Sequence, residues 1–226
     1  IGQYRLSLHK RSGVTDMNMF KPDDVVLFQG DSITDVNRSR EDDSLLGNGY
    51  PMMIRASYFS KYPEARITFL NRGISGNRVK DLQARFEKDF IDLKPTWISI
   101  LIGVNDCWRR YDSNDPTSAE EFEERYRDLL TKLRQNTYAK LILCEPFLLH
   151  VTPDRAIWRE DLDPKIAVVR KLAKEFNTLL VPLDSIFTDA AAKRSPEFWS
   201  ADGVHPTDAG HALIMRAWLD TMKIEL

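Results

Sequence analysis

The chain has 226 residues, of which 42% are hydrophobic, and its 32 basic and 34 acidic residues give a formal net charge of -2. This length is enough to bury the core of one domain. The nearly balanced charge provides no basic surface of the kind that binds nucleic acid or an anionic membrane. We therefore expect a small-molecule or polymeric substrate, and neither a nucleic-acid nor a membrane partner.

The two cysteines, Cys107 and Cys144, are far apart in the chain and have apolar or aromatic neighbours. This spacing indicates neither a disulfide framework nor a metal site, and free buried thiols are expected. No apolar run approaches the roughly 18 residues of a transmembrane helix, and residues 1–15 lack the core of a signal peptide. Together these features favour a cytoplasmic protein, although a mature secreted chain would also lack its signal.

The polar and basic residues at the start of the chain differ in composition from the rest. We interpret residues 1–20 as an N-terminal arm and residues 21–226 as a single domain. The arm has three open interpretations, namely an added segment, an alternative start, or a segment that packs on a neighbour.

The first predicted strand is the run 25–28, which is short, β-branched and aromatic, as expected of a strand buried on both faces. It leads into a turn in which Gly30 permits close or sharp backbone geometry. Asp31, Ser32 and Thr34 follow, and each of these residue types can cap a helix. The turn therefore places one serine at a strand end.

Four more apolar runs of strand length follow, at residues 67–70, 97–102, 141–144 and 179–181. Between them, apolar residues at helical spacing predict helices at 52–58, 79–90, 118–133, 166–176 and from 207 onward. A long loop containing Pro153 is expected before the fourth of these helices. Strands that alternate with helices predict a three-layer α/β/α sandwich around a five-stranded, mostly parallel, flavodoxin-like sheet.

Three of the predicted strands run into polar turns that contain glycine, and these turns carry Ser32, Gly73 and Asn105. Ligands of parallel sheets bind beyond the carboxyl ends of the strands. A serine there is a weak nucleophile, so catalysis by Ser32 requires a base, an acid that orients the base, and donors for an oxyanion.

Among the four histidines, His205 is the best candidate for the base. Asp202 precedes it by three residues in a turn bounded by glycine and proline. This spacing allows the carboxylate to fold back onto Nδ1 and leaves Nε2 free for Ser32. The other histidines are less favoured, because one lies in the arm, one in a loop without a close acidic residue, and one inside the final helix: His9, His150 and His211.

The oxyanion of a tetrahedral intermediate needs preorganised donors. The Gly73 N–H and the Asn105 side-chain amide can supply two of them, and the Ser32 N–H a third. Each feature alone is more commonly a turn or a cap than a catalytic group. Their order along the chain is more specific than any one of them.

Together these features resemble the four ordered motifs of the SGNH hydrolase family, also called GDSL esterases and lipases. The matching stretches are residues 28–35, 71–77, 103–106 and 202–206. By this resemblance Ser32 is the nucleophile, Gly73 and Asn105 are oxyanion donors, His205 is the base and Asp202 orients it. The resemblance implies a serine esterase that needs no cofactor and no metal.

Residues 71–81 and 102–112 are also similar to the corresponding stretches of bacterial intracellular acetylxylan esterases in this family. Those enzymes remove acetyl groups from xylo-oligosaccharides and form homo-oligomers. The similarity implies an acetylated sugar as substrate and a homo-oligomeric protein. Trp108 and Tyr111 are candidates for stacking on a sugar ring, although aromatic residues at such positions more commonly pack a loop.

Alternative functions stay open at this point. The same residues can serve a thioesterase, a lysophospholipase or an acyltransferase, and a non-catalytic carbohydrate-binding module is a further alternative. Ser75 is an unfavoured nucleophile because it lacks the Gly-x-Ser-x-Gly pattern. Asp31, Asp35 and Asp106 are interpreted as capping and hydrogen-bonding residues and not as metal ligands.

Overall fold

The computed structural model describes residues 20–225 and contains the expected five-stranded sheet. The strands are β1 (Val25–Gly30), β2 (Thr68–Asn71), β3 (Trp97–Leu101), β4 (Lys140–Cys144) and β5 (Leu179–Val181). All neighbouring strands are parallel, and their order is β2-β1-β3-β4-β5. This is the flavodoxin-like order, so the predicted fold class is confirmed.

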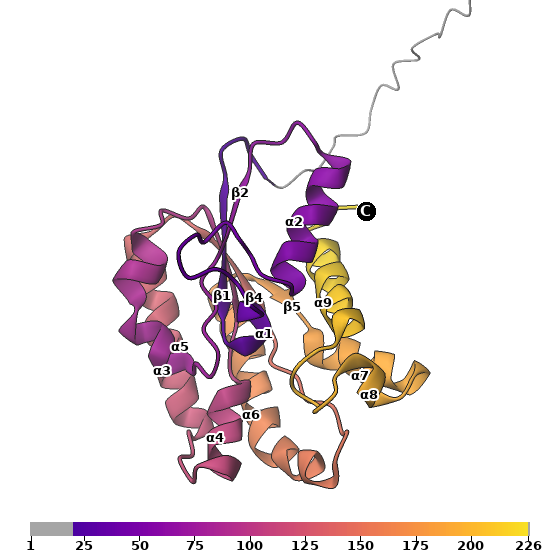
Figure 1. Cartoon of the computed structure of the whole chain (residues 1–226). Helices are drawn as coiled ribbons and strands as arrows, with labels where there is room; N and C mark the ends of the chain where they lie inside the picture. Colours follow the sequence, from indigo (N-terminus) through magenta and orange to yellow (C-terminus); the bar gives the residue numbers. More distant parts are fainter. Residues whose placement is uncertain (1–19, 226) are drawn as a thin grey trace, which may run out of the picture.

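Helices cover both faces of the sheet (Figure 1). One layer contains α2 (Tyr50–Lys61), α7 (Leu183–Lys193) and α9 (Asp208–Thr221), and the other contains α3 (Val79–Ala84), α5 (Ala119–Asn136) and α6 (Pro153–Glu175). Shorter helical elements are α1 (Ser32–Asp35), the π-helical turn η1 (Glu87–Ile91), α4 (Val104–Asp112) and α8 (Pro196–Trp199). Among residues 20–225, no helix combines the length and apolar character needed to cross a membrane.

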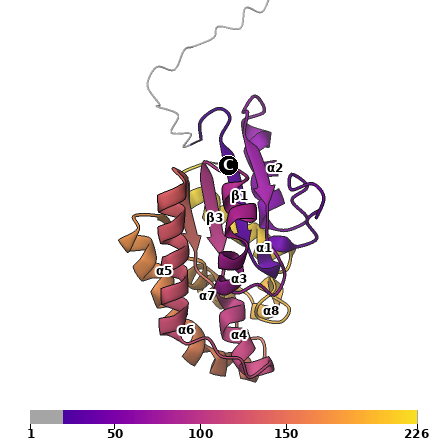
Figure 2. The same cartoon turned by 90° about the vertical axis from the view of Figure 1, so that its left-hand side faces the viewer.

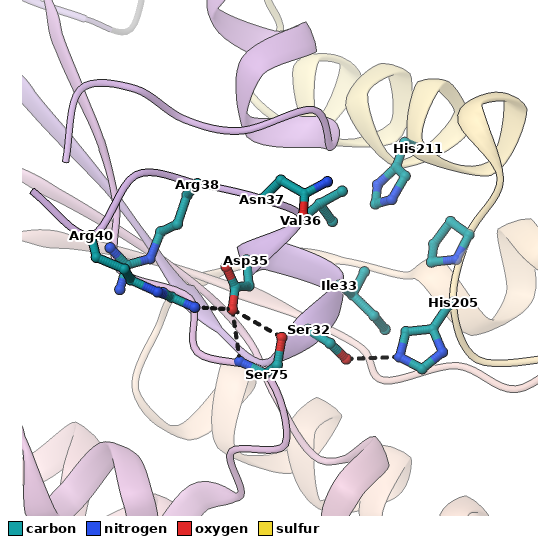
Figure 3. A pocket seen from close by; sticks show the side chains of 11 residues that line it. Ser32, Ile33, Asp35, Val36, Asn37, Arg38, Arg40, Ser75, His205 and His211 are labelled. Carbon is teal, nitrogen blue, oxygen red and sulfur yellow. Dashed lines mark hydrogen bonds and ion pairs between the residues drawn. The ribbon is translucent and has the colours of Figure 1, made fainter. Parts of the chain in front are cut away.

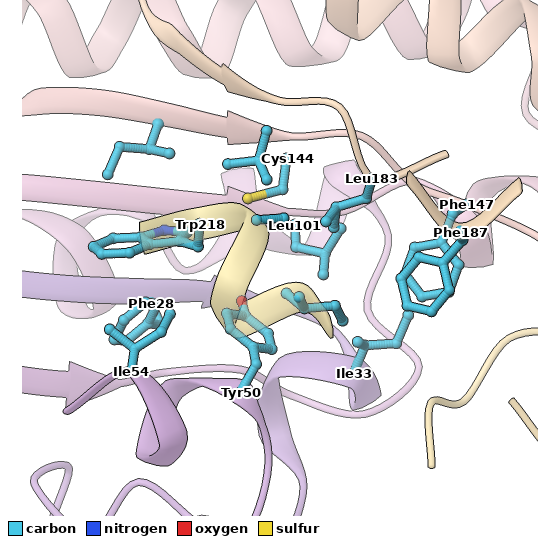
Figure 4. Packing of buried hydrophobic residues seen from close by; sticks show 14 of the residues in the cluster. Phe28, Ile33, Tyr50, Ile54, Leu101, Cys144, Phe147, Leu183, Phe187 and Trp218 are labelled. Atoms are coloured by element: carbon cyan, nitrogen blue, oxygen red, sulfur yellow. The ribbon is translucent and has the colours of Figure 1, made fainter. Parts of the chain in front are cut away.

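The apolar core beneath α2 and α9 is built around aromatic residues of β1 and of these two helices (Figure 4). Phe28 packs edge-on against Tyr50 and next to Trp218. The Trp218 indole donates a hydrogen bond to Ser99 Oγ at 3.1 Å, so its polar atom is satisfied although the ring is fully buried. This packing anchors β1 in the core. The turn that carries Ser32 begins at the carboxyl end of this strand.

Two predicted helices differ in their bounds from the observed ones. α6 begins at Pro153, where a loop was expected, because proline has no N–H to lose in the first turn of a helix. The predicted helix 79–90 is divided into α3 and η1, although Phe86 and Phe90 are both buried as their spacing indicated. The expected arm falls on residues 1–19, outside the described part, whereas Phe20 packs edge-on against Trp97 in the core.

The carboxyl ends of β1, β2 and β3 lie at one edge of the sheet. Phe28 pairs with Asn71 on one side and with Ser99 on the other, so the loops after these three strands leave the sheet together. Figure 1 and Figure 2 show α1 and α4, which begin directly after β1 and β3, at the same end of the molecule. The parallel register therefore collects the turns that carry Ser32, Gly73 and Asn105.

Candidate active site

Ser32 is the first residue of α1, directly after the tight turn that ends β1. At Gly30 an added Cβ would lie 2.4 Å from the carbonyl oxygen of Leu101 and from Thr34 Oγ1, so no larger residue fits. Asp31 caps α1 by accepting the Ile33 N–H at 3.0 Å. The turn thus directs the half-buried Ser32 side chain outward at the edge of the sheet.

At this edge Ser32 forms a hydrogen-bonded chain with two side chains that are distant from it in sequence. Ser32 Oγ lies 2.9 Å from His205 Nε2, and His205 Nδ1 lies 2.7 Å from Asp202 Oδ2 (Figure 3 shows the first contact). The other Asp202 oxygen accepts the N–H groups of Val204 and His205, at 2.9 and 2.7 Å. The carboxylate therefore folds back onto the imidazole in the way that the three-residue spacing indicated.

The protonation of this pair follows from its contacts. Partial burial opposes ionisation of Asp202, but the hydrogen bonds from the His205 ring and from the backbone outweigh it and lower the carboxyl pKa well below its usual range. The hydrogen bond to Asp202 raises the pKa of His205, against the opposing effect of burial. A charged Asp202 keeps the proton on Nδ1, so that Nε2 accepts from the Ser32 hydroxyl.

Gly73 does not have the free N–H that an oxyanion donor needs. Its N–H donates to Asn71 Oδ1 at 2.9 Å, and the residue is buried. An added Cβ would lie 2.6 Å from the Asp35 nitrogen, so the glycine is required for close packing of this loop against α1. The prediction of Gly73 as a donor disagrees with this geometry.

Gly76, in the same loop, has the properties that Gly73 lacks. It is exposed, its φ is +81°, and its N–H makes no hydrogen bond to another residue between 20 and 225. On one side of it, Ser75 donates its N–H and Oγ–H to Asp35 Oδ2, both at 2.9 Å. On the other side, the Asn77 carbonyl accepts from Asn105 Nδ2 at 3.1 Å. The left-handed Ser-Gly-Asn turn is the sequence signal that distinguishes Gly76.

Asn105 lies in the first turn of α4 and is almost completely buried. Its side-chain nitrogen carries two protons, and the bond to the Asn77 carbonyl uses one of them. This bond fixes the orientation of the amide and leaves the second N–H available. The Ser32 N–H is likewise without a hydrogen bond in the described chain.

The acidic residues near the strand ends make hydrogen bonds within the protein. Asp31 and Asp106 are buried, and burial raises the pKa of each to about 7, although each accepts a backbone N–H, from Ile33 and Val79 respectively. Asp35 binds Ser75 and Arg40. Among residues 20–225, no three His, Cys, Asp or Glu side chains are grouped as a metal site would require. The predicted capping and hydrogen-bonding roles agree with this arrangement.

The cysteines are buried, as expected, and the helical histidine is buried as well. Cys107 and Cys144 are free thiols, and burial raises the pKa of each to about 12, so both stay protonated near neutral pH. His211 accepts the Tyr50 N–H at 3.3 Å, and burial lowers its pKa to about 4. None of these groups competes with His205 as a base.

The two aromatic candidates on α4 occupy different positions. The Trp108 ring lies 5.7 Å from the His205 ring, whereas Tyr111 stacks on Trp158 at 5.1 Å and donates its hydroxyl to a backbone carbonyl. Tyr111 is thus engaged in packing, and only Trp108 borders the site. Arg155, which was not predicted, lies over both tryptophan rings and donates from Nε to the Asp202 carbonyl at 2.9 Å.

A pocket of about 470 Å³ opens beside Ser32 and His205 (Figure 3). The opposite wall comes from the loop after α1, which contributes Asn37, Arg38 and Arg40. This volume lies within the range of about 300–1,000 Å³ that is common for small-molecule sites. The pocket gives a ligand direct access to the serine.

The sequence matches the model of the GDSL-like lipase/acylhydrolase family over residues 28–213. The chain therefore belongs to this family, and it is a carboxylic ester hydrolase. The match includes each of the four motif stretches identified from the sequence.

The chain is 36% identical to the acetylxylan esterase of Geobacillus stearothermophilus over 208 residues, which are 88% of this chain and 94% of that protein. The solved structure of that esterase superimposes with a TM-score of 0.84 at 35% identity and covers 90% of this chain and 96% of its own. A protein from Parabacteroides merdae described as a GDSL-like lipase gives a TM-score of 0.86 at 34% identity, covering 91% and 98%.

A more distant relative is thioesterase 1/protease 1/lysophospholipase L1 of Escherichia coli, 24% identical over 164 residues, which are 71% of each protein. Solved variants of the Geobacillus esterase that are described as catalytic mutants replace a serine, an aspartate and a histidine by alanine. In that esterase the aspartate precedes the histidine by three residues.

Proposed function

We propose that this protein is a serine esterase that removes acetyl groups from xylo-oligosaccharides through an acyl-enzyme. The observation that carries the proposal is the hydrogen-bonded chain from Ser32 through His205 to Asp202. The proposal is also supported by the spacing of three residues between Asp202 and His205. The aspartate and histidine that are replaced in the catalytic mutants of the Geobacillus esterase have the same spacing.

The reaction has two steps. In the first, Ser32 Oγ attacks the acetyl carbon while His205 Nε2 takes the hydroxyl proton. The tetrahedral intermediate then breaks its bond to the sugar oxygen, which leaves as the alcohol with the proton from His205. In the second step, water attacks the acetyl-enzyme with His205 as base, and acetate and free Ser32 are formed.

Three N–H groups serve as oxyanion donors in this proposal: those of the Ser32 backbone, the Gly76 backbone and the Asn105 side chain. Gly76 replaces Gly73 because the N–H of Gly73 is already bonded to Asn71, while that of Gly76 has no partner among residues 20–225. The contacts of Ser75 with Asp35 and of Asn77 with Asn105 support a position of Gly76 between the other two donors.

Replacing Asn105 by alanine is expected to lower kcat by about 10²- to 10³-fold, the usual effect of losing one oxyanion donor. Initial-rate assays with p-nitrophenyl acetate measure this effect. The matched control is Asn136→Ala, which lies at the exposed end of α5. A change confined to KM would instead assign Asn105 to substrate binding.

Two observations support an acetylated sugar as the substrate, namely the 36% identity with the acetylxylan esterase and the polar pocket. This substrate is tested by measuring turnover of p-nitrophenyl esters of increasing acyl-chain length and of acetylated xylo-oligosaccharides. We expect turnover to be highest for the acetyl esters, and we expect the acetylated oligosaccharides to be hydrolysed as well. Preference for long acyl chains or for acyl-thioesters would favour the thioesterase or lysophospholipase alternative that the Escherichia coli relative suggests.

The remaining alternatives are separated by the same assays. Transfer of acetyl groups to added sugar acceptors in place of hydrolysis would identify an acyltransferase. The intact serine, histidine and aspartate contacts argue against a non-catalytic carbohydrate-binding module. Homo-oligomer formation and a cytoplasmic location stay predictions, and the proposed steps use no cofactor.

A further inference from the structure

We propose that Arg38 and Arg40 form an anion subsite in the pocket wall, which selects acetylated oligosaccharides that carry a carboxylate, such as a uronic acid. This inference rests on the proposed function and specifies its substrate. It depends on the geometry, charge and burial of the two arginines.

The two guanidinium groups converge on one atom beside the pocket. Arg38 Nε and Arg40 Nη1 both donate to the Gly73 carbonyl, at 2.7 and 3.0 Å. Arg40 Nη2 also pairs with Asp35 Oδ2 at 2.5 Å, and both arginines line the pocket that contains Ser32 (Figure 3). These bonds hold the guanidinium groups in place before a ligand binds, which lowers the entropy cost of recognition.

The surrounding ion-pair network has one more positive than negative charge. Its members are Arg38, Arg40, Arg72 and Arg85 against Asp35, Asp43 and Asp89. Asp43 lies 2.7 Å from Arg72 but 3.6 Å from Arg38, so Arg38 has the weakest partner in the network. The next acidic residues along the loop, Glu41 and Asp42, do not line the pocket.

Arg38 is a charged group with little solvent, and its ion pair with Asp43, at 3.6 Å, is the longest in this network. Its side chain is only 4% exposed, and its Nη2 makes no hydrogen bond to another described residue. Burying a charge whose counterion is at the limit of ion-pair distance is costly, so a carboxylate ligand in the pocket would offset part of that cost. The Arg40 side chain is 53% exposed and lines the same pocket.

The backbone of this wall is strained. Val36 and Asn37 have φ values of 22° and 59°, which residues other than glycine rarely adopt, a β-branched one least of all. Gly47 packs directly behind them, where an added Cβ would lie 2.1 Å from the Val36 carbonyl oxygen. Strain that the neighbouring structure maintains is concentrated at binding and catalytic sites, and here it shapes the wall that faces Ser32.

Ser32, Asp35 and the two arginines line the same pocket. Asp35 follows Ser32 by three positions on α1, so their Cβ atoms are about 5–6 Å apart, and Arg40 lies beyond Asp35. An acetyl ester at Ser32 and a carboxylate at the arginines can therefore belong to neighbouring parts of one oligosaccharide. A planar guanidinium suits a carboxylate because it can donate two parallel hydrogen bonds.

The test uses two acetylated xylo-oligosaccharides that differ only at a glucuronic acid substituent, free in one and methyl-esterified in the other. At low ionic strength we expect KM to be about three- to tenfold lower for the free acid. The difference should vanish in about 1 M salt, where the screening length is about 3 Å. It should also vanish in Arg40→Gln and persist in part in Arg40→Lys.

The matched control is Arg66→Gln, because Arg66 is an exposed arginine that also pairs with an aspartate, but just before β2, at the opposite end of the strand from the pocket. This variant should keep the ratio of the two KM values. Turnover of both substrates with equal KM would overturn the subsite and leave the esterase function in place. An equal loss of turnover on both substrates in Arg40→Gln would also overturn the subsite. That result would mean that Arg40 acts by holding Asp35 in place and not by binding the substrate carboxylate.

Two further results separate this inference from the proposed function. Turnover of p-nitrophenyl acetate without turnover of either oligosaccharide would reject both the sugar substrate and the subsite. Absence of turnover for every ester would reject the esterase proposal itself.

Discussion

The Ser32→Ala variant is expected to lose about 10⁵- to 10⁶-fold in kcat on p-nitrophenyl acetate, because no acyl-enzyme can form without the hydroxyl oxygen. Stability should change little. Ser32 is only half-buried, and within residues 20–225 its hydroxyl makes one hydrogen bond, to His205, whose loss costs about 0.5–1.5 kcal/mol. Thermal unfolding followed by circular dichroism measures this, so that lost activity can be assigned to chemistry.

Labelling by a fluorophosphonate gives an independent measurement. Wild-type protein should gain the mass of one phosphonyl group, and Ser32→Ala should gain none. Ser185→Ala is the matched control, since Ser185 is exposed on α7 and its hydroxyl donates to the backbone carbonyl of Pro182. Activity of Ser32→Ala near the wild-type level would remove Ser32 from the mechanism.

Asp202→Asn is expected to lower kcat by about 10⁴-fold, as in other serine hydrolases that lose the orienting carboxylate. An amide can turn an N–H toward His205 Nδ1, which favours the tautomer with its proton on Nε2. That proton then faces Ser32 Oγ, which lies 2.9 Å away, and the base can no longer accept the serine proton. The exposed Asp189 on α7, replaced by asparagine, is the matched control.

The pH profile of kcat/KM tests the same pair. Activity requires neutral His205, so it should fall as the pH drops through the His205 pKa, which the bond to Asp202 raises above the ordinary value of about 6.5. In Asp202→Asn the midpoint should move to lower pH. Asp31, with a pKa raised by burial to about 7, interacts with His205, so the acid limb should be broader than one ionisation. An unchanged midpoint in Asp202→Asn would contradict the pairing.

Local patterns in the sequence were sufficient for much of the fold. Short apolar runs predicted all five strands, and helical spacing predicted α2, α5 and α9, because burial on one side or both leaves a period in the chain. The start of α6 and the short helices α4, α7 and α8 were not predicted. Their boundaries depend on contacts with other elements, which a local window does not contain.

The candidate site divides in the same way. The Asp202–His205 contact could be predicted because both residues belong to one turn, where the spacing limits the geometry. The choice between Gly73 and Gly76 as the proposed oxyanion donor could not be predicted from the sequence. It depends on which N–H is already bonded to Asn71 and on which carbonyl the Asn105 amide reaches. The packing of Tyr111 on Trp158, 47 positions along the chain, was likewise invisible to local reasoning.

The sequence by itself determined the class of fold, the turn that carries Ser32 and the turn that carries Asp202 and His205, because apolar periodicity and short turn motifs act over a few residues. Only the tertiary structure decided which atoms meet: Ser32 with His205, Asn105 with the Asn77 carbonyl, and Arg38 beside Arg40 in the pocket wall. The physical reason is that hydrogen-bond partners and burial are set by the parallel register of the sheet, which brings together loops far apart in the chain.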